Sequence, residues 1–248
     1  MITYKSDYEI KKMREAGRLA ALSMEKIASY IKPGISTGEL DDILFDYIKT
    51  LGGTPSFKGY QGFPGSACIS VNDQVVHGIP GARILNPGDI VSVDLGVCYK
   101  GFQSDMARTF PVGAISPSAQ KLIEVTKECF YLGMAAAVEG NRIHDISAAI
   151  EARANQEGYG IVRELVGHGI GQDLHEGPDI PNFTSKRKGP VLKKGMTLAI
   201  EPMINEGTRE VDFSEDGWTV TTKDGSYSAH YENTIAVLGN KPEILTAV

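Results

Sequence analysis

The sequence predicts an α/β (α+β) fold built from two related halves that form one domain. Segments with the spacing of amphipathic helices are followed by segments in which apolar and polar residues alternate, and this order occurs twice. Two stretches of the first half also align with stretches of the second at nearly equal offsets. The length of 248 residues suits one large domain or two small ones, and 42% hydrophobic residues suffice for a core.

Composition and charge predict a cytoplasmic protein that binds neither nucleic acid nor membranes. The net charge is −6, so the chain as a whole does not suggest a nucleic-acid-binding surface. Its apolar runs are far shorter than the ~20 residues of a membrane helix, and its start lacks the apolar core of a signal peptide. The cysteines, Cys68, Cys98 and Cys129, are widely spaced and fit no zinc-ribbon pattern, which indicates a reducing compartment.

The first half opens with two predicted helices. Ser6 and Asp7 precede a long apolar stripe of helical spacing, and residues 32–34, Lys-Pro-Gly, end this helix. Thr37 starts the second helix, which the glycines at residues 52–53 close. The elements that follow are a loop over residues 54–66, a short strand over residues 67–72 and a turn over residues 85–89.

Residues 90–110 are the hairpin around which we expect the molecule to be organised. Alternating apolar residues predict a strand, Lys100-Gly101 can close a tight turn, and a returning strand follows. Asp94 and Asp105 then lie on one face, roughly 5 to 8 Å apart. Two like charges at that distance repel, so a shared proton or a bound cation must compensate. The alternative is that each acid is simply exposed on a solvated hairpin.

The second half repeats the order of the first. Residues 118–138 predict a long helix, and a shorter helix begins at Ile143. The elements after it are a strand over residues 161–166, a Gly-rich stretch over residues 168–178, a turn and strand over residues 192–204, and a closing hairpin over residues 216–238 with Asp224-Gly225 at its turn.

An internal duplication explains this repetition. Residues 32–43 align with residues 138–149 at an offset of 106, and residues 85–94 align with residues 192–201 at an offset of 107. We therefore expect halves of approximately 1–112 and 117–248 within a single catalytic domain, 1–248. The alternative is a chance resemblance between helix-turn-strand sequences.

The duplication makes four carboxylates equivalent in pairs. Asp94 corresponds to Glu201, and Asp105 corresponds to Glu232 when extra residues are allowed in the second loop. Glu201 precedes a proline, which favours an extended backbone at the end of a strand. Exposure on a strand face accounts well for any one of these acids but poorly for all four. We expect the four to converge on one cleft.

Histidines add nitrogen ligands to this set. His168 lies between glycines that allow close backbone approach, while His175 and His77 are further candidates and His144, on a helix, is expected to be structural. Four carboxylates with one imidazole suit Mn, Fe(II), Co or Zn in a two-metal site. Two ions roughly 3.5–4 Å apart can activate a bridging water, and amide hydrolysis is the natural use. The sequence contains no Walker loop, dinucleotide fingerprint or G-x-S-x-G motif.

Taken together, these motifs resemble type I methionine aminopeptidases over nearly the whole chain. They are the segments HGIP, GHGIG, LHEGP and IEP, the aspartate pair of the hairpin and the strand at Glu232. The resemblance implies the pita-bread fold: two pseudo-symmetric halves, with a central antiparallel sheet and helices on its outer face. It also implies removal of N-terminal methionine from nascent proteins and peptides when the second residue is small. A cytoplasmic monomer is expected, with peptide N-termini as partners and the ribosome exit region as a further candidate partner.

The same resemblance implies the metal ligands. Asp94 would chelate one metal, Asp105 and Glu232 would bridge both, and His168 and Glu201 would complete the second. Glu201 would also act as the proton shuttle for the bridging water.

The remaining roles belong to substrate binding and catalysis. His175 would stabilise the tetrahedral intermediate, and His77 would hold the substrate amine and scissile nitrogen. The residues implied for the methionine pocket are Tyr60, Phe63, Cys68 and Trp218. Phe63 and Leu174 stand where the best-known bacterial members have Tyr and Phe. The resemblance therefore implies an apolar pocket but does not predict its shape.

Three other function classes compete with this one. Proline-specific peptidases of the same fold carry an N-terminal domain for which this chain has no room. Non-catalytic relatives lose metal ligands, whereas all five stand here. A phosphohydrolase would need a phosphate-binding loop that the sequence lacks. The short run between Glu201 and Glu232 also leaves no room for the helical insert of type II enzymes, so a minimal bacterial form is expected.

Overall fold

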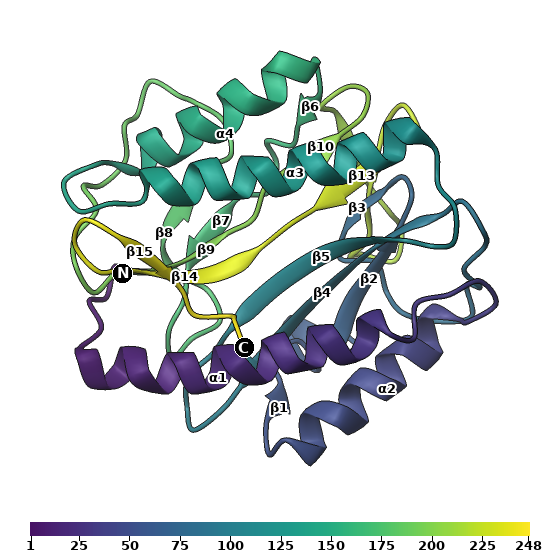
Figure 1. Cartoon of the computed structure of the whole chain (residues 1–248), viewed down its shortest axis with the longest axis horizontal. Coiled ribbons are helices and arrows are strands. Elements are labelled where there is room, and N and C mark those ends of the chain that lie inside the picture. Colours follow the sequence, from purple (N-terminus) through teal and green to yellow (C-terminus); the bar gives the residue numbers. More distant parts are fainter.

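Two pairs of helices flank a set of antiparallel strands in the computed structural model, which describes residues 1–248 (Figure 1). Helices α1 and α2 pack together on one side of the strands, and α3 and α4 pack together on the other. The helices are α1 (Asp7–Ala28), α2 (Thr37–Thr50), α3 (Pro117–Ala136) and α4 (Ile143–Glu157). The strands are β1 (Thr54–Pro55), β2 (Ala67–Val71), β3 (Gln74–Val76), β4 (Ile90–Cys98), β5 (Asp105–Pro111), β6 (Gly160–Ile161), β7 (Gly167–Gly169), β8 (Glu176–Ile180), β9 (Thr197–Ile200), β10 (Met203–Asn205), β11 (Val211–Phe213), β12 (Val220–Thr222), β13 (Ser228–His230), β14 (Asn233–Val237) and β15 (Pro242–Ile244).

The first two helices begin with the same side-chain arrangement. Ser6 Oγ accepts from the Glu9 backbone N–H, and the Glu9 carboxylate accepts from the Ser6 backbone N–H. Ser36 and Glu39 repeat this capping box at α2. Each box satisfies two backbone groups that a helix end leaves free. Both predicted helix starts are therefore confirmed within one residue.

The predicted hairpin is confirmed in position and in register. β4 pairs with β5, Gly96 lies opposite Asp105, and Asp94 lies opposite Ala107. The turn contains Lys100-Gly101, both with positive φ (50° and 80°), a conformation that glycine adopts readily. Because opposed residues share a face, the two aspartates project to the same side, and both are buried. The exposed, solvated hairpin is thus ruled out.

The second half contains a five-stranded sheet in the order β15-β14-β9-β7-β8. Two predictions in this half were wrong. The strand expected over residues 161–166 is limited to β6, which ends at Ile161, and the closing hairpin does not form. The turn at Asp224-Gly225 forms, but β12 pairs with β11 and β3, whereas β13 pairs with β10. After the turn, the Ser228 backbone N–H donates to Asn72 O, which draws the chain to a different neighbour. A turn signal is local, whereas the choice of strand partner depends on distant residues.

The two halves meet along β5 and residues 230–234. The backbone N–H of Ala107 donates to Glu232 O at 3.3 Å, and that of Glu232 donates to Ala107 O at 3.0 Å. On either side, the Asp105 N–H donates to Thr234 Oγ1 and the His230 N–H donates to Thr109 Oγ1. We call this antiparallel contact the seam. It places acids from both halves beside one another.

The hydrophobic core is divided in the same way. One cluster of 22 buried residues includes the inner faces of α3 and α4, and another of 19 includes those of α1 and α2. A third cluster of 11 residues contains Phe57, Phe63 and Cys68, which line a cavity described below. None of the helices has the length and apolar character needed to span a membrane.

Candidate active site

Each of the four acids stands at or beside a strand of the two halves. Asp94 is inside β4 and Asp105 begins β5. Glu201 follows β9, where Pro202 ends the strand, and Glu232 directly precedes β14. Asp94, Asp105 and Glu232 are 9%, 4% and 2% exposed. All four line one cavity, as the sequence predicted.

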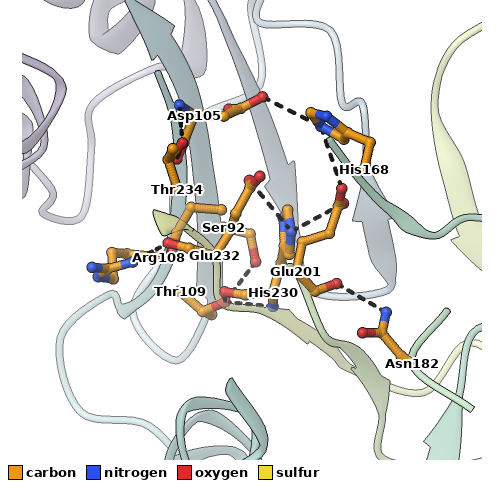
Figure 2. Close-up of polar contacts among 11 residues, drawn as sticks. Ser92, Asp105, Arg108, Thr109, His168, Asn182, Glu201, His230, Glu232 and Thr234 are labelled. Carbon is orange, nitrogen blue, oxygen red and sulfur yellow. Dashed lines mark hydrogen bonds and ion pairs between the residues drawn. The ribbon is translucent and has the colours of Figure 1, made fainter. Parts of the chain in front are cut away.

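Contacts from neighbouring elements hold the two glutamates. Asn182 Nδ2 donates to the Glu201 carbonyl oxygen at 3.0 Å, and Arg108, from β5, donates to the Glu232 carbonyl oxygen at 2.6 Å. The guanidinium of Arg108 also lies over the ring of Tyr231 at 4.0 Å. The backbone of both glutamates is thus fixed, and Figure 2 shows the Glu201 carboxylate beside His168 and His230 and the Glu232 carboxylate beside His230.

The buried carboxylates strongly favour their neutral forms in the absence of a counter-charge. Burial raises the pKa of Asp94 to about 7, and burial together with neighbouring carboxylates raises the pKa values of Asp105, Glu201 and Glu232 well above the usual range. Three buried oxygens, Asp94 Oδ1, Asp105 Oδ1 and Glu232 Oε1, accept no hydrogen bond. Buried polar oxygens without partners are rare, so this cluster requires protons or a cation.

His168 is oriented as a metal ligand. Its Nδ1 lies 2.8 Å from Gly169 O, so Nδ1–H donates there and the lone pair of Nε2 faces the acids. Nε2 is 3.8 Å from Asp105 Oδ2 and 3.7 Å from Glu201 Oε1. Burial lowers the pKa of His168 to about 3, so the ring is neutral at pH 7.

The glycines around His168 permit this packing. A Cβ on Gly169 would lie 2.1 Å from Gly177 O, and a Cβ on Gly167 would lie 2.5 Å from Ala199 O. No larger residue fits at either position without moving β8 or β9. The predicted close backbone approach is confirmed, although His168 lies in the short strand β7.

The donor set fits a divalent cation. One donor atom from each of Asp105, His168 and Glu232 lies within 4.8 Å of the other two, and all three residues are buried. Unpaired carboxylate oxygens and one neutral imidazole are ligands that Mn, Fe(II), Co and Zn accept. Asp94 and Glu201 flank this group on the same cavity.

The cavity has a volume of about 230 Å³ and an apolar end beside the acids. Phe63 meets the Trp218 ring edge-on at 5.1 Å, and Tyr60, Leu174 and Cys68 complete the wall. Burial raises the pKa of the Cys68 thiol well above its ordinary value, so this cysteine is a neutral, apolar wall residue. The structure therefore brings every residue predicted for the methionine pocket to one place.

Two more histidines reach the same cavity. His175 Nδ1 lies 2.8 Å from the Tyr60 hydroxyl, and its ring is 4.1 Å from that of His168. His77 faces Trp218 and has a positive φ of 59°, a strained conformation for a residue with a side chain. Burial lowers the pKa of His77 to about 4 and lowers that of His175, so both are neutral at pH 7.

Sequence reasoning missed two features of the site. His230, noted only for sharing a face with Glu232, lies between Glu201 and Glu232. Lys5 forms a buried ion pair of 2.5 Å with Glu176, the neighbour of His175, and Thr3 also donates to Glu176. The alternation of strand residues was a signal for His230, because positions 230 and 232 face the same side. No local pattern links Lys5 to Glu176.

Known proteins share this sequence and this fold. The family model "Metallopeptidase family M24" matches residues 11–238. A methionine aminopeptidase of Clostridium perfringens is 52% identical over 248 residues, which cover all of both chains. The crystal structure of methionine aminopeptidase from Thermotoga maritima superposes with a TM-score of 0.98 at 41% identity and covers both chains fully. A prolidase from Pyrococcus furiosus, 23% identical, covers 99% of this chain and 65% of its own at a TM-score of 0.82, and it shares the fold alone.

These matches agree with the architecture described above. The antiparallel strands between two helix pairs are the pita-bread fold that the sequence motifs implied, and that prediction is confirmed. The family match spans both halves and includes all four acids and the three histidines of the cavity. The chain belongs to metallopeptidase family M24.

Proposed function

We propose that this protein is a metal-dependent aminopeptidase that removes N-terminal methionine from proteins and peptides. The observation that carries the proposal is one cavity in which the acids and His168 adjoin an apolar end. That combination suits a substrate with a free amine, a scissile amide and an apolar first side chain. The full-length relatives named methionine aminopeptidases support the same activity.

The proposed site holds two divalent ions, drawn from Co, Mn, Fe(II) and Zn. Asp94 would hold one ion, Asp105 and Glu232 would bridge, and His168 with Glu201 would complete the other. The bound ions would supply Lewis-acid polarisation of the scissile carbonyl and a water of lowered pKa. The unpartnered oxygens of Asp94, Asp105 and Glu232 support this assignment.

Glu201 is placed to move the proton in the proposed mechanism. Its side chain is 15% exposed and lines the cavity, so one carboxylate oxygen can reach the attacking water. The carboxylate would take the proton of that water and pass it to the departing amine nitrogen. In the metal-free site, burial and the neighbouring Asp94 and Asp105 raise the pKa of Glu201 well above its usual range.

The two cavity histidines would act on the peptide group. If the Tyr60 hydroxyl donates to His175 Nδ1, the ring proton of His175 lies on Nε2 and can donate to the oxyanion of the tetrahedral intermediate. His77, held neutral by burial, would hydrogen-bond the substrate amine and scissile nitrogen. Tyr60, Phe63, Cys68 and Trp218 would surround the methionine side chain.

The size of the second substrate residue is expected to matter. His77 and Trp218 crowd the cavity beside the acids, with ring centroids 6.4 Å apart. A small second side chain would fit beside these rings, while a large one would clash. We further propose a cytoplasmic monomer with one domain, residues 1–248, formed by a repeat of approximately 1–112 and 117–248. Nascent chains at the ribosome exit region would be natural partners.

A peptide panel with metal reconstitution tests the proposal. The chain is stripped with a chelator, reloaded with Mn²⁺ or Co²⁺, and offered Met-Gly-Met, Met-Leu-Met, an X-Pro peptide and a phosphoester. Free methionine is expected from Met-Gly-Met alone, only after reloading. Equal turnover of the Met-Gly and Met-Leu peptides would contradict the size rule, and cleavage of the X-Pro peptide or the phosphoester would contradict the activity.

A further inference from the structure

His230 is a fully buried histidine with no hydrogen-bond partner on either ring nitrogen. It ends β13, is 2% exposed, and neither Nδ1 nor Nε2 has a partner in the protein. Its Nε2 lies 3.7 Å from Glu201 Oε2 and 3.9 Å from Glu232 Oε2 (Figure 2). A neutral imidazole has one N–H donor, and burying that donor without a partner destabilises the folded protein. A histidine of this kind, packed behind two acids that line the cavity, needs a role.

The Glu201 carboxylate lies between two imidazoles. His168 Nε2 faces Oε1 at 3.7 Å, and His230 Nε2 faces Oε2 at the same distance (Figure 2). The two rings therefore face different oxygens of the Glu201 carboxylate. Each ring could in principle ligate an ion or donate a proton.

The partner of Nδ1, on the far side of each ring, shows whether Nε2 carries a lone pair for an ion or a proton for a hydrogen bond. Metal-ligating histidines almost always donate their second ring N–H to a carbonyl or carboxylate, which leaves a lone pair toward the ion. His168 has this contact through Nδ1 and Gly169 O, at 2.8 Å. His230 Nδ1 has no such partner, so nothing holds its proton on Nδ1. Two carboxylate oxygens instead face its Nε2, and they favour the tautomer with the proton on Nε2.

We propose that His230 is a positioning residue that donates its Nε2–H to Glu201 Oε2 and so fixes the orientation of that carboxylate. The donor needs to approach by less than about 1 Å to reach hydrogen-bond distance. Oε1 is then the oxygen that faces His168, while Oε2 faces His230. The role of Glu201 rests on the proposed function, but the hydrogen bond itself does not.

The proposal predicts an effect on metal binding as well as on turnover. Partners that orient ligating carboxylates and imidazoles typically contribute about 10- to 100-fold in metal affinity. Loss of the donor would leave Glu201 Oε2 buried and free to rotate. A change confined to the packing of β13 would not alter the ions' ligand geometry.

Paired substitutions provide the test. His230→Gln places an amide N–H near the position of Nε2, whereas His230→Leu fills the space without a donor. We expect His230→Leu to weaken Mn²⁺ or Co²⁺ binding by about 10- to 100-fold in calorimetric titration, to change the visible spectrum of the Co²⁺ form, and to lower kcat more than it raises KM. His230→Gln should restore the affinity and the spectrum. His144→Gln, on α4 and outside the cavity, is the matched control.

The outcomes distinguish the proposal from its competitors. Unchanged affinity and spectrum in His230→Leu would overturn it in favour of simple packing. Loss of one coordinated imidazole in His230→Gln, counted by X-ray absorption, would overturn it in favour of direct ligation. If His230→Leu fails to fold, His230→Asn serves instead, because its amide reaches the Nδ1 position but falls short of Glu201. Failure of the proposed function would show separately, as wild-type protein that binds metal but releases no methionine.

Discussion

The two halves of the molecule supply the same number of carboxylates by different means. Asp94 and Asp105 are short side chains on adjacent strands, and the ladder between β4 and β5 fixes both. Glu201 and Glu232 are longer side chains just outside strands, and contacts from Asn182 and Arg108 fix their backbone. The aspartates of the first half are therefore placed mainly by backbone pairing, with one side-chain contact from Thr234, whereas the glutamates of the second half depend on side chains from both halves.

The seam between the halves has the form of a local two-fold relation. The Asp105 backbone N–H donates to the Thr234 hydroxyl, and Ala107 and Glu232 exchange two backbone hydrogen bonds. If Asp105 is equivalent to Glu232, then Ala107 is equivalent to Thr234. A two-fold rotation then carries the Asp105–Thr234 contact onto the Ala107–Glu232 contact. Any two antiparallel strands share such a local relation, so the proposed repeat has to be tested over longer segments. Superposing residues 85–94 on residues 192–201 tests it: the same rotation should carry Asp105 near Glu232, and His168 should find no acidic counterpart.

The largest expected effect comes from one bridging carboxylate of each half. Asp105→Asn and Glu232→Gln should both abolish methionine release and reduce the number of bound ions, because each removes a charge shared by the proposed pair. Metal analysis after gel filtration and a Met-Gly-Met assay measure this. Asp212→Asn, on exposed β11, is the control. If only one of the two substitutions is harmful, the halves are not equivalent.

His175→Ala should separate catalysis from metal binding. His175 contacts Tyr60 and His168 but is not among the proposed ligands. Loss of one donor to a developing oxyanion typically lowers kcat by on the order of 10²–10³. We expect that loss with the metal stoichiometry unchanged, as measured by titration and steady-state kinetics. A lower stoichiometry would make His175 a ligand.

The buried Lys5–Glu176 pair joins the first half to the second. Its side chains are 4% and 9% exposed, and Glu176 Oε1 also accepts from the Gln172 N–H. Removing one partner of a buried pair typically destabilises a protein by about 3–5 kcal/mol. Lys5→Met should therefore destabilise the protein strongly in denaturant unfolding, and Lys5→Met/Glu176→Gln should be less harmful than the sum of the singles. If the losses of unfolding free energy in the two single variants simply add in the double variant, Lys5 and Glu176 do not stabilise each other.

The smallest effect concerns pH and the acid of the first hairpin. Burial raises the pKa of Asp94 from 3.8 to about 7, so after chelator treatment the folded state holds a proton that the unfolded state has lost between those values. Stability from this group is complete below pH ~4 and decreases as pH rises through 7, by at most about 1.4 kcal/mol per pH unit. Melting curves between pH 5.5 and 8 measure this decrease. Asp94→Asn should make the decrease less steep, because Asp105, Glu201 and Glu232, whose pKa values burial also raises, contribute the remainder. Saturating Mn²⁺ should flatten it, and an unchanged slope in Asp94→Asn would show that Asp94 does not contribute to the decrease.

The sequence predicted what depends on local pattern and failed where distant residues decide. The helix starts followed from Ser6, Thr37 and their neighbours, and the hairpin register followed from alternation and the Lys100-Gly101 turn. The expected hairpin at Asp224-Gly225 failed because β12 and β13 find better partners in β3 and β10.

The residues of the candidate site also differ in whether local sequence or distant residues determine their place. Its acids and His168 could be found because the repeat and the flanking residues mark them. His230 was marked only by sharing a face with Glu232, and its contact with Glu201 could not be predicted because that contact depends on the pairing of β10 with β13. Lys5 and Glu176 meet only when the whole chain has folded.

The seam also sets the order in which the site can form during folding. β4 and β5 are joined by a short turn, so their hairpin closes with little loss of chain entropy. Glu232 reaches Ala107 only by closing a loop that contains α3, α4 and most strands of the second half. Contacts of such long sequence separation form slowly. A chain that folds in the direction of its synthesis first buries an incomplete pair of aspartates and gains its full ligand set at one late docking step. Early intermediates should therefore capture metal weakly, and binding of the cation should accelerate no step before that docking.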